Sequence, residues 1–162
     1  MTGPAATDWR GSTRVMLWVL LVVYIFNFLD RQIVNILAEP IRKDLDLSDT
    51  QIGLMTGLAF ALFYTFLGLP IARIADRPTT NRGWLIAGAL AVWSGMTALC
   101  GLAQNFAQLL LARIGVGVGE AGCTPAAHSL IADRVPANKR ASAMAFYALG
   151  IPAGSLLGMV IG

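Results

Sequence analysis

Five apolar stretches constrain the fold of this chain more than any other feature. A helix needs about 20 predominantly apolar residues to cross the ~30 Å hydrocarbon layer of a membrane, and each stretch has that length. Only 13% of the 162 residues are charged and 56% are hydrophobic, whereas about a quarter of a soluble domain is charged. We therefore predict an all-α integral membrane protein with a cytoplasmic tail at residues 1–14. Its expected spans are residues 15–38, 52–72, 84–103, 106–132 and 141–162.

The ends of the spans follow from helix-breaking and capping residues. Pro40 is expected to end the first span, and Ser48 or Asp49 is expected to cap the second. Because the first apolar run is too long for a cleavable signal peptide, we expect it to remain as a membrane span. Gly53 and Gly57 have the four-residue spacing that lets helix backbones approach closely in lipid.

Lysine and arginine residues lie mostly on one side of the predicted membrane. Eight of the twelve fall in the N-terminal tail and in the loops that precede the third and fifth spans. Since cytoplasmic loops carry an excess of Lys and Arg, we predict a multi-pass chain with a cytoplasmic N-terminus. This distribution accounts for the basic composition without a nucleic acid partner.

The fourth span contains two charged residues among otherwise apolar and small residues (109–125). Arg113 and Glu120 are two helical turns apart, so they share one helix face, together with Thr124. The opposite face carries only small residues, namely Gly115, Gly119, Gly122 and Ala126. We expect the small face to pack on a neighbouring helix and the polar face to line a cavity.

An ionisable pair at membrane depth is costly, by at least ~2.5–3.5 kcal/mol per charge, and is therefore a candidate functional site. The alternative is a buried ion pair that only fixes helix packing, where removing one partner would leave the other uncompensated.

Residues 117–122 also match the dinucleotide fingerprint G-x-G-x-x-G. No strand precedes them, so nucleotide binding is not expected.

The first span carries a second polar cluster in its outer half. Asp30 and Arg31 share one broad helix face with three further polar residues that we expect to line a cavity, which are Tyr24, Asn27 and Asn35. Arg31 and Arg113 each lie about seven residues from the outer end of their span, or ~10 Å deep. Pairs between Asp30 and Arg113 and between Arg31 and Glu120 are thus sterically reasonable. In a low-dielectric cavity such carboxylates can take up and release protons; a boundary pair near the interface is the alternative for Asp30 and Arg31.

The two basic loops also hold acidic residues. Asp76 follows the second span together with Arg77 and Arg82, and Asp133 precedes the fifth span. This order allows a pair between Asp133 and either arginine, and a solvated loop is the alternative. The fifth span contains Pro152 between glycines, which would permit a bend and close packing.

These motifs resemble those of the major facilitator superfamily. The sequence RIADRPTTNR resembles its loop signature G-x-x-x-D-R-x-G-R-R: Asp76, Arg77 and Arg82 match, whereas Ala72 stands in place of glycine. RIGVGVG is similar to the arginine–glycine motif of the superfamily's fourth helix. Within the superfamily, the sequences FLDRQ, GLAFALFY and RIGVGVGEAGCTPAA look like the spinster-like branch.

The resemblance implies the N-terminal helical bundle of a major facilitator fold and a proton-coupled secondary transporter. Its substrate would be an amphiphilic lipid such as a sphingolipid or lysolipid, or a small organic solute, with no cofactor besides the proton and no metal. Asp30, Arg31 and Glu120 would serve substrate binding or proton coupling, with Arg113 as their partner. Asp76 would help to latch the inner gate. We expect this chain to lack the C-terminal half of the transporter and to reside in a bacterial inner membrane.

A second function remains open from the residues alone. The chain could be a small helical membrane assembly or scaffold protein whose intramembrane charges only hold helices together. An enzyme is not expected, because the sequence shows no nucleophile–base set and no cluster of metal ligands.

Overall fold

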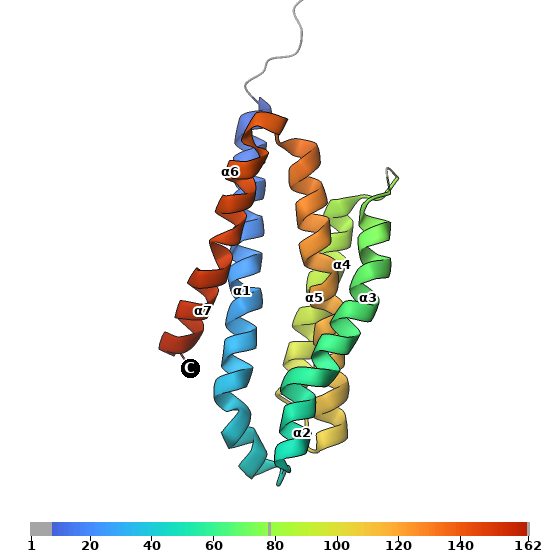
Figure 1. The fold of residues 1–162 in the computed structure, drawn as a ribbon, viewed down its shortest axis with the longest axis vertical. Helices are drawn as coiled ribbons and strands as arrows, with labels where there is room; N and C mark the ends of the chain where they lie inside the picture. The colour runs from blue at the N-terminus through green and yellow to red at the C-terminus, as the bar shows by residue number, and fades with distance from the viewer. Residues whose placement is uncertain (1–7, 78, 162) are drawn as a thin grey trace, which may run out of the picture. The chain divides into compact units, whose positions relative to one another are not determined.

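A computed structural model describes residues 8–77 and 79–161, with the backbone alone for residues 8–10, 59 and 60. The regular structure in this part of the chain is entirely helical, which confirms the expected all-α fold class (Figure 1). The helices are α1 (Asp8–Asp44), α2 (Asp49–Gly53), the π-helix η1 (Leu54–Leu58), α3 (Ala59–Ala75), α4 (Arg82–Cys100), α5 (Phe106–Arg134), α6 (Ala137–Ala148) and α7 (Gly150–Ile161).

Five helical segments among the described residues are long and apolar enough to cross a membrane. They are Gly11–Asp44, Asp49–Ala75, Arg82–Cys100, Phe106–Arg134 and Ala137–Ile161. Residues 8–14, which were expected to belong to the tail, form the beginning of α1 instead. Residues 1–7 of that tail lie outside the described residues.

Pro40 does not end the first helix, contrary to the expectation. The α1 helix continues for four residues beyond it, although an internal proline removes a helical hydrogen bond and costs ~3 kcal/mol. The helix ends in a Schellman motif, in which the Leu47 N–H donates to the Arg42 carbonyl at 2.8 Å and Asp46 has a left-handed φ of 50°. Leu47 is buried in an apolar cluster with residues of η1 and α5. This burial favours the longer helix.

Ser48, one of the two expected caps, caps the second helical segment. Its hydroxyl accepts a hydrogen bond from the Gln51 N–H at 3.3 Å, and the Gln51 side chain accepts one from the Ser48 N–H at 2.9 Å, which completes a capping box. The π-helix η1 follows α2 and has the wider i→i+5 pattern. A Cβ on Gly53 or Gly57 would meet no atom of the described chain within 4 Å, so the close approach expected at these glycines is not made within this part of the chain.

The last expected span consists of two helices. α6 begins within the basic segment that was expected to be a loop, and Leu149 separates α6 from α7. Leu149 has φ −59° and ψ −19°, so the backbone stays right-handed through the junction. Pro152 has no N–H to donate to the carbonyl of Ala148, four residues earlier, and this missing hydrogen bond accounts for the interruption.

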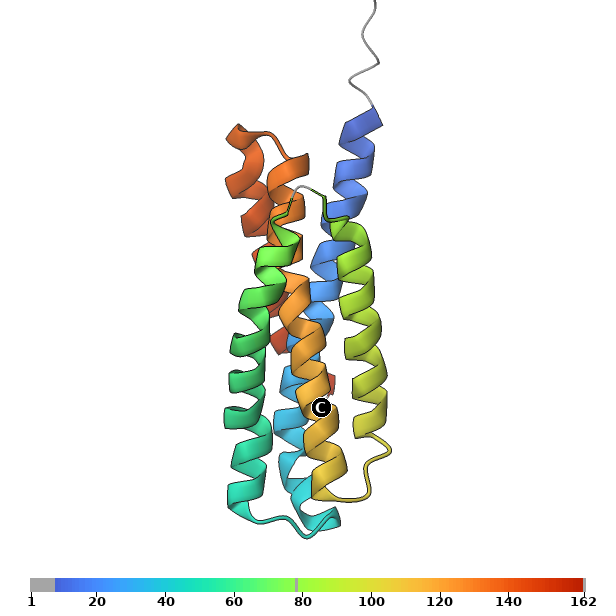
Figure 2. The same ribbon diagram turned by 90° about the vertical axis from the view of Figure 1, so that its right-hand side faces the viewer.

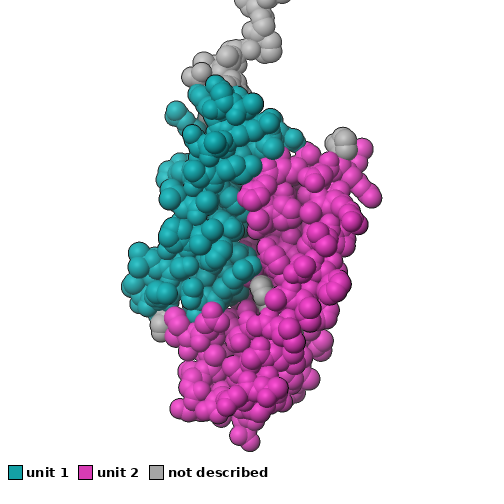
Figure 3. Space-filling model, viewed as in Figure 1, with its two compact units in different colours: residues 1–33, 131–162 teal, residues 34–130 magenta. Residues whose placement is uncertain are grey.

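The chain divides into two compact units, which are described separately: residues 1–33 with 131–162, and residues 34–130 (Figure 3). In the second unit α5 lies between α3 and α4 (Figure 2). A Cβ on Gly119 of α5 would lie only 2.6 Å from the backbone nitrogen of Trp93 in α4. A Cβ on Gly122 would lie 3.0 Å from the Cβ of Ala89, also in α4. The expected packing of the small face of α5 on a neighbouring helix is therefore confirmed.

In the first unit α6 and α7 lie along α1 (Figure 1). A Cβ on Gly150 would lie 2.9 Å from the Cβ of Tyr24, and one on Gly154 would lie 2.8 Å from the Cβ of Phe28. The Tyr24 and Tyr147 rings stack with their centres 4.2 Å apart. The expected close packing of the fifth span is thus confirmed, with α1 as its partner. In lipid such close contact drives helix association, because burying apolar surface there gains little.

We predict a graded response to Gly→Ala substitution at the contact between α4 and α5. Gly119→Ala would place a methyl group against the Trp93 backbone and cost about 1–3 kcal/mol through overpacking. Gly115→Ala would meet only the flexible Met96 side chain, so its loss should be smaller. Gly95→Ala is the control, since its Cβ would meet open space and alanine favours the helix. Thermal unfolding in detergent measures the three effects, and equal melting temperatures for Gly119→Ala and Gly95→Ala would contradict the prediction.

Candidate functional site

The α5 helix carries two buried charged side chains. Arg113 is 4% exposed and Glu120 is 0% exposed. Because α5 is a single helix across both positions, their separation of two turns corresponds to ~10 Å along its axis, on the same side. Thr124, about one turn beyond Glu120, is half-buried.

The glycine face of α5 fixes the rotation of the helix about its axis. Gly115, Gly119 and Gly122 all approach side chains or backbone of α4. On a helix with 3.6 residues per turn they lie roughly opposite Arg113 and Glu120. The two charged side chains therefore start from the side of α5 that faces away from α4. The cavity expected on that side stays a prediction.

Polar residues of α1 differ widely in their exposure. Asn27 is 4% exposed, Asp30 and Arg31 are half-buried, and Asn35 is exposed. The Arg31 guanidinium lies over the Phe28 ring, 5.4 Å from the ring centre, which is a cation–π contact. Both residues belong to α1, so this contact lies within one helix.

Tyr24, which was expected to line a cavity, uses its ring for packing. The ring stacks on Tyr147 of α6 and meets the Phe28 ring edge to face, with the two centres 5.2 Å apart. Such aromatic pairs contribute about 0.5–1.5 kcal/mol beyond the area they bury. A cavity-lining role of Tyr24 remains a prediction beside this structural one.

Each expected ion pair involves one residue from each of the two units. Asp30 and Arg31 belong to the first unit, whereas Arg113 and Glu120 belong to the second. The pairs between Asp30 and Arg113 and between Arg31 and Glu120 therefore stay predictions.

Arg82 anchors the connection between α3 and α4. Its Nε–H is shared between the Ala75 carbonyl at 3.0 Å and the Ser129 hydroxyl at 2.7 Å. The guanidinium thereby ties the end of α3 and the start of α4 to α5. The sequence did not indicate a role for Ser129, because no sequence pattern links a single serine within a helix to an arginine 47 residues away.

The other charges of this connection are exposed. Asp76 is the C-cap residue of α3, and its N–H donates to the Ala72 carbonyl at 3.0 Å. Asp76 and Arg77 are both exposed, as is Asp133 in α5. Asp133 belongs to the first unit, so its expected pair with Arg77 or Arg82 stays a prediction. The connection therefore combines one structural arginine with several solvent-accessible charges.

The chemistry available to α5 is that of binding and proton exchange. A carboxylate and a guanidinium at membrane depth can hold a polar or charged solute, or relay a proton. Among the described residues there is no group of three or more His, Cys, Asp or Glu side chains that could hold a metal ion.

Comparison with known families gives a match over most of the chain. Residues 20–162 match the profile of the Major Facilitator Superfamily. An MFS-type efflux pump of Mycolicibacterium smegmatis is 42% identical over 144 residues, which cover 89% of this chain and 33% of that protein. A probable L-galactonate transporter of Escherichia coli is 33% identical, with 85% of this chain and 30% of that protein covered.

Spinster proteins are also similar to this chain. Human protein spinster homolog 1 is 32% identical over 94% of this chain and 29% of its own length. A crystal structure of a bacterial homolog to the human lysosomal transporter Spinster, inward-facing and unoccupied, has a TM-score of 0.86. It is 44% identical, with 95% of this chain and 31% of that chain covered. The expected similarity to the spinster-like branch is confirmed, and the chain spans about a third of the length of these relatives.

We predict that Arg82→Gln destabilises the protein by about 1–2 kcal/mol, because it removes a charged donor shared by two acceptors. Arg77→Gln is the matched control, since Arg77 is an exposed arginine of the same connection and should change stability by less than about 0.5 kcal/mol. Ser129→Ala should reproduce part of the Arg82→Gln loss. Thermal unfolding in detergent compares the variants, and an Arg82→Gln protein as stable as Arg77→Gln would disprove the anchoring role.

Proposed function

Because this chain belongs to the Major Facilitator Superfamily, we propose that it is the N-terminal part of a secondary active transporter that works by alternating access. Transporters of this superfamily are built from two six-helix halves, and substrate binds near the membrane midplane between them. Five candidate membrane spans and coverage of about a third of the relatives' length are consistent with most of the first half. The relatives with transport names support the same activity.

The observation that carries this proposal is the burial of Arg113 and Glu120 within one membrane helix. Keeping two charges at that depth costs several kcal/mol, and both residues start from the side of α5 opposite the glycines that contact α4. A transport cycle would make use of both charges, because protonation or substrate binding can change the net charge of the site as it opens to each side of the membrane.

The residue roles in the proposed cycle follow the resemblance to the superfamily. Asp30, Arg31 and Glu120 bind substrate or couple its movement to protons, and Arg113 is their charge partner. Further cavity-lining residues are Tyr24, Asn27, Asn35 and Thr124. Asp76, Arg77 and Asp133 form the inner gate, and Arg82 holds the gating connection in place.

The proposed substrate is an amphiphilic lipid, such as a sphingolipid or lysolipid, or a small organic solute. The spinster proteins among the relatives motivate the lipid, and the probable L-galactonate transporter motivates the solute. The proposed location is a bacterial inner membrane with the N-terminus in the cytoplasm, where the basic connections after α3 and α5 would also lie.

We predict that Glu120→Gln abolishes proton-driven transport by the full-length protein while leaving its expression intact. The amide keeps the size of the side chain but can neither carry the charge nor take up the proton. Proteoliposomes with an imposed pH gradient and an internal pH-sensitive dye measure the proton flux, with a lysophospholipid and a sugar acid as the two candidate substrates.

Glu39→Gln serves as the matched control. Glu39 is an exposed glutamate that pairs with Arg42 at 2.8 Å and with Lys43 at 3.4 Å near the end of α1, so its loss should leave transport unchanged. Full proton-driven uptake by Glu120→Gln would refute the coupling role. If Glu120→Gln instead loses transport only to the extent that it unfolds, the alternative of a purely structural charge pair is supported.

A further inference from the structure

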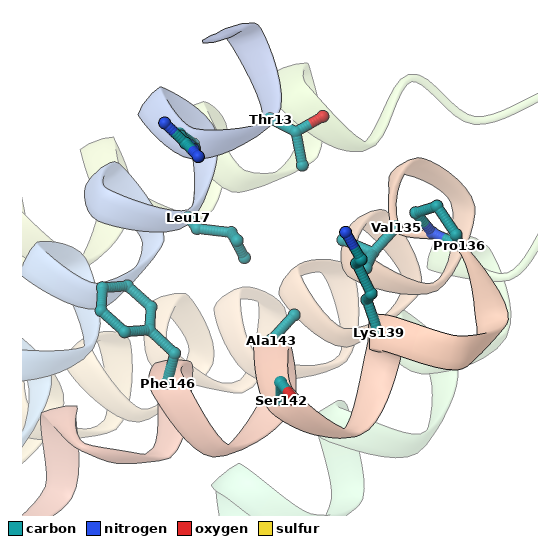
Figure 4. Close-up of a pocket in the computed structure, with 9 residues that line it drawn as sticks. Thr13, Leu17, Val135, Pro136, Lys139, Ser142, Ala143 and Phe146 are labelled. Carbon is teal, nitrogen blue, oxygen red and sulfur yellow. The ribbon is translucent and has the colours of Figure 1, made fainter. Parts of the chain in front are cut away.

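A cavity opens in the first unit between the beginning of α1 and α6. Its volume is about 290 Å³. Figure 4 shows Thr13 and Leu17 of α1 on one side and Lys139, Ala143 and Phe146 of α6 on the other. No residue with a role in the proposed transport path lines it among those described. The cavity is therefore separate from the residues of the proposed transport path.

The polar part of the cavity is suited to an anion. Arg14 and Lys139 supply two cationic side chains, Thr13 and Ser142 supply hydroxyl groups, and all described lining residues are neutral or cationic. Arginine and lysine form short, charge-assisted hydrogen bonds to phosphate. Since both cations are exposed, a headgroup can reach them without displacing packed side chains.

The start of α6 strengthens this anion preference. Pro136 is the N-cap of this twelve-residue helix and makes no side-chain cap hydrogen bond, and it lines the cavity. The N-terminal end of a helix carries partial positive charge and favours phosphate groups. The Arg140 Nε–H donates to the Val135 carbonyl at 3.0 Å, which fixes the turn into α6 and adds a third cation beside it.

The remaining walls of the cavity are apolar and adjoin the membrane-spanning part of the unit. Leu17, Ala143 and Phe146 line it, and the Phe146 ring meets the Trp18 ring edge to face at 5.0 Å. Arg14 directly precedes the apolar run of α1, so the cavity lies where a membrane interface is expected. Its volume is at the lower limit of the roughly 300–1,000 Å³ typical of ligand pockets, enough for a headgroup but not for a whole lipid.

We propose that this cavity binds the phosphate headgroup of an anionic phospholipid, with Arg14 and Lys139 as its charge partners and Leu17 and Phe146 beside its acyl chains. Basic pockets at membrane interfaces recognise anionic lipids in this way. A bound lipid would bridge α1 and α6 and stabilise the first unit. This proposal does not depend on the transported substrate.

The test is lipid-dependent thermal stability of the full-length protein in detergent. Dioleoylphosphatidylglycerol should raise the melting temperature of the unsubstituted protein, whereas dioleoylphosphatidylcholine should not. Arg14→Gln and Lys139→Gln should each raise the half-maximal lipid concentration about five-fold, because one interfacial cation contributes about that factor. The double variant should be weaker than either, and Lys139→Arg should retain binding.

Arg73→Gln is the matched control, because Arg73 is an exposed cation in the last turn of α3 and does not line the cavity. It should leave the half-maximal concentration unchanged. A double variant that responds to phosphatidylglycerol like the unsubstituted protein would overturn the proposal. An equal response to phosphatidylcholine would also overturn it, and so would a full response to inorganic phosphate alone, which would indicate a soluble anion.

Discussion

Close contact between helix backbones is the constraint on which the rest of this structure depends. In lipid, helices gain little by hiding apolar surface from their surroundings, so association depends on packing distance. Each unit meets this requirement with glycines: Gly119 lies against the Trp93 backbone, and Gly154 lies against the Ile25 carbonyl of α1. The rotation of α5 and of α7 is set by these contacts, and with it the direction of every other side chain on those helices.

The charged residues fall into two groups that this packing distinguishes. Arg82 donates to the Ala75 carbonyl at the end of α3 and to the Ser129 hydroxyl within α5, so this arginine stabilises the fold. Arg113 and Glu120 are buried side chains of α5 that lie roughly opposite the glycines in contact with α4. A membrane protein bears the energetic cost of such residues where function needs them, which is the basis of the role proposed for both.

Much of the fold could be predicted from the sequence because apolar length and small-residue spacing act locally. The helical class and the packing face of α5 followed from them directly. The prediction that the first helix ends at Pro40 was wrong. The helix continues to a Schellman motif, and the burial of Leu47 against residues distant in sequence favours this longer helix. The π-helix η1 has no sequence signal of its own. At the candidate site, Arg113 and Glu120 could be identified from the sequence because they are charged residues in an otherwise apolar span. The Ser129 contact and the cavity near Arg14 could not, because each is formed by residues that are distant in sequence.

The division of α5 into two faces has a consequence for how such a protein can diverge. Gly119 on the glycine face lies so close to the Trp93 backbone that a larger side chain would disturb the contact with α4. Thr124 lies on the other face, so its exchange is expected to leave the glycine contacts with α4 unchanged. A lineage can thus acquire a new solute while keeping one scaffold, in keeping with similar chains that bear the names of an efflux pump and a probable L-galactonate transporter. Under the proposed function, the same separation makes the polar face of α5 the place to redesign selectivity.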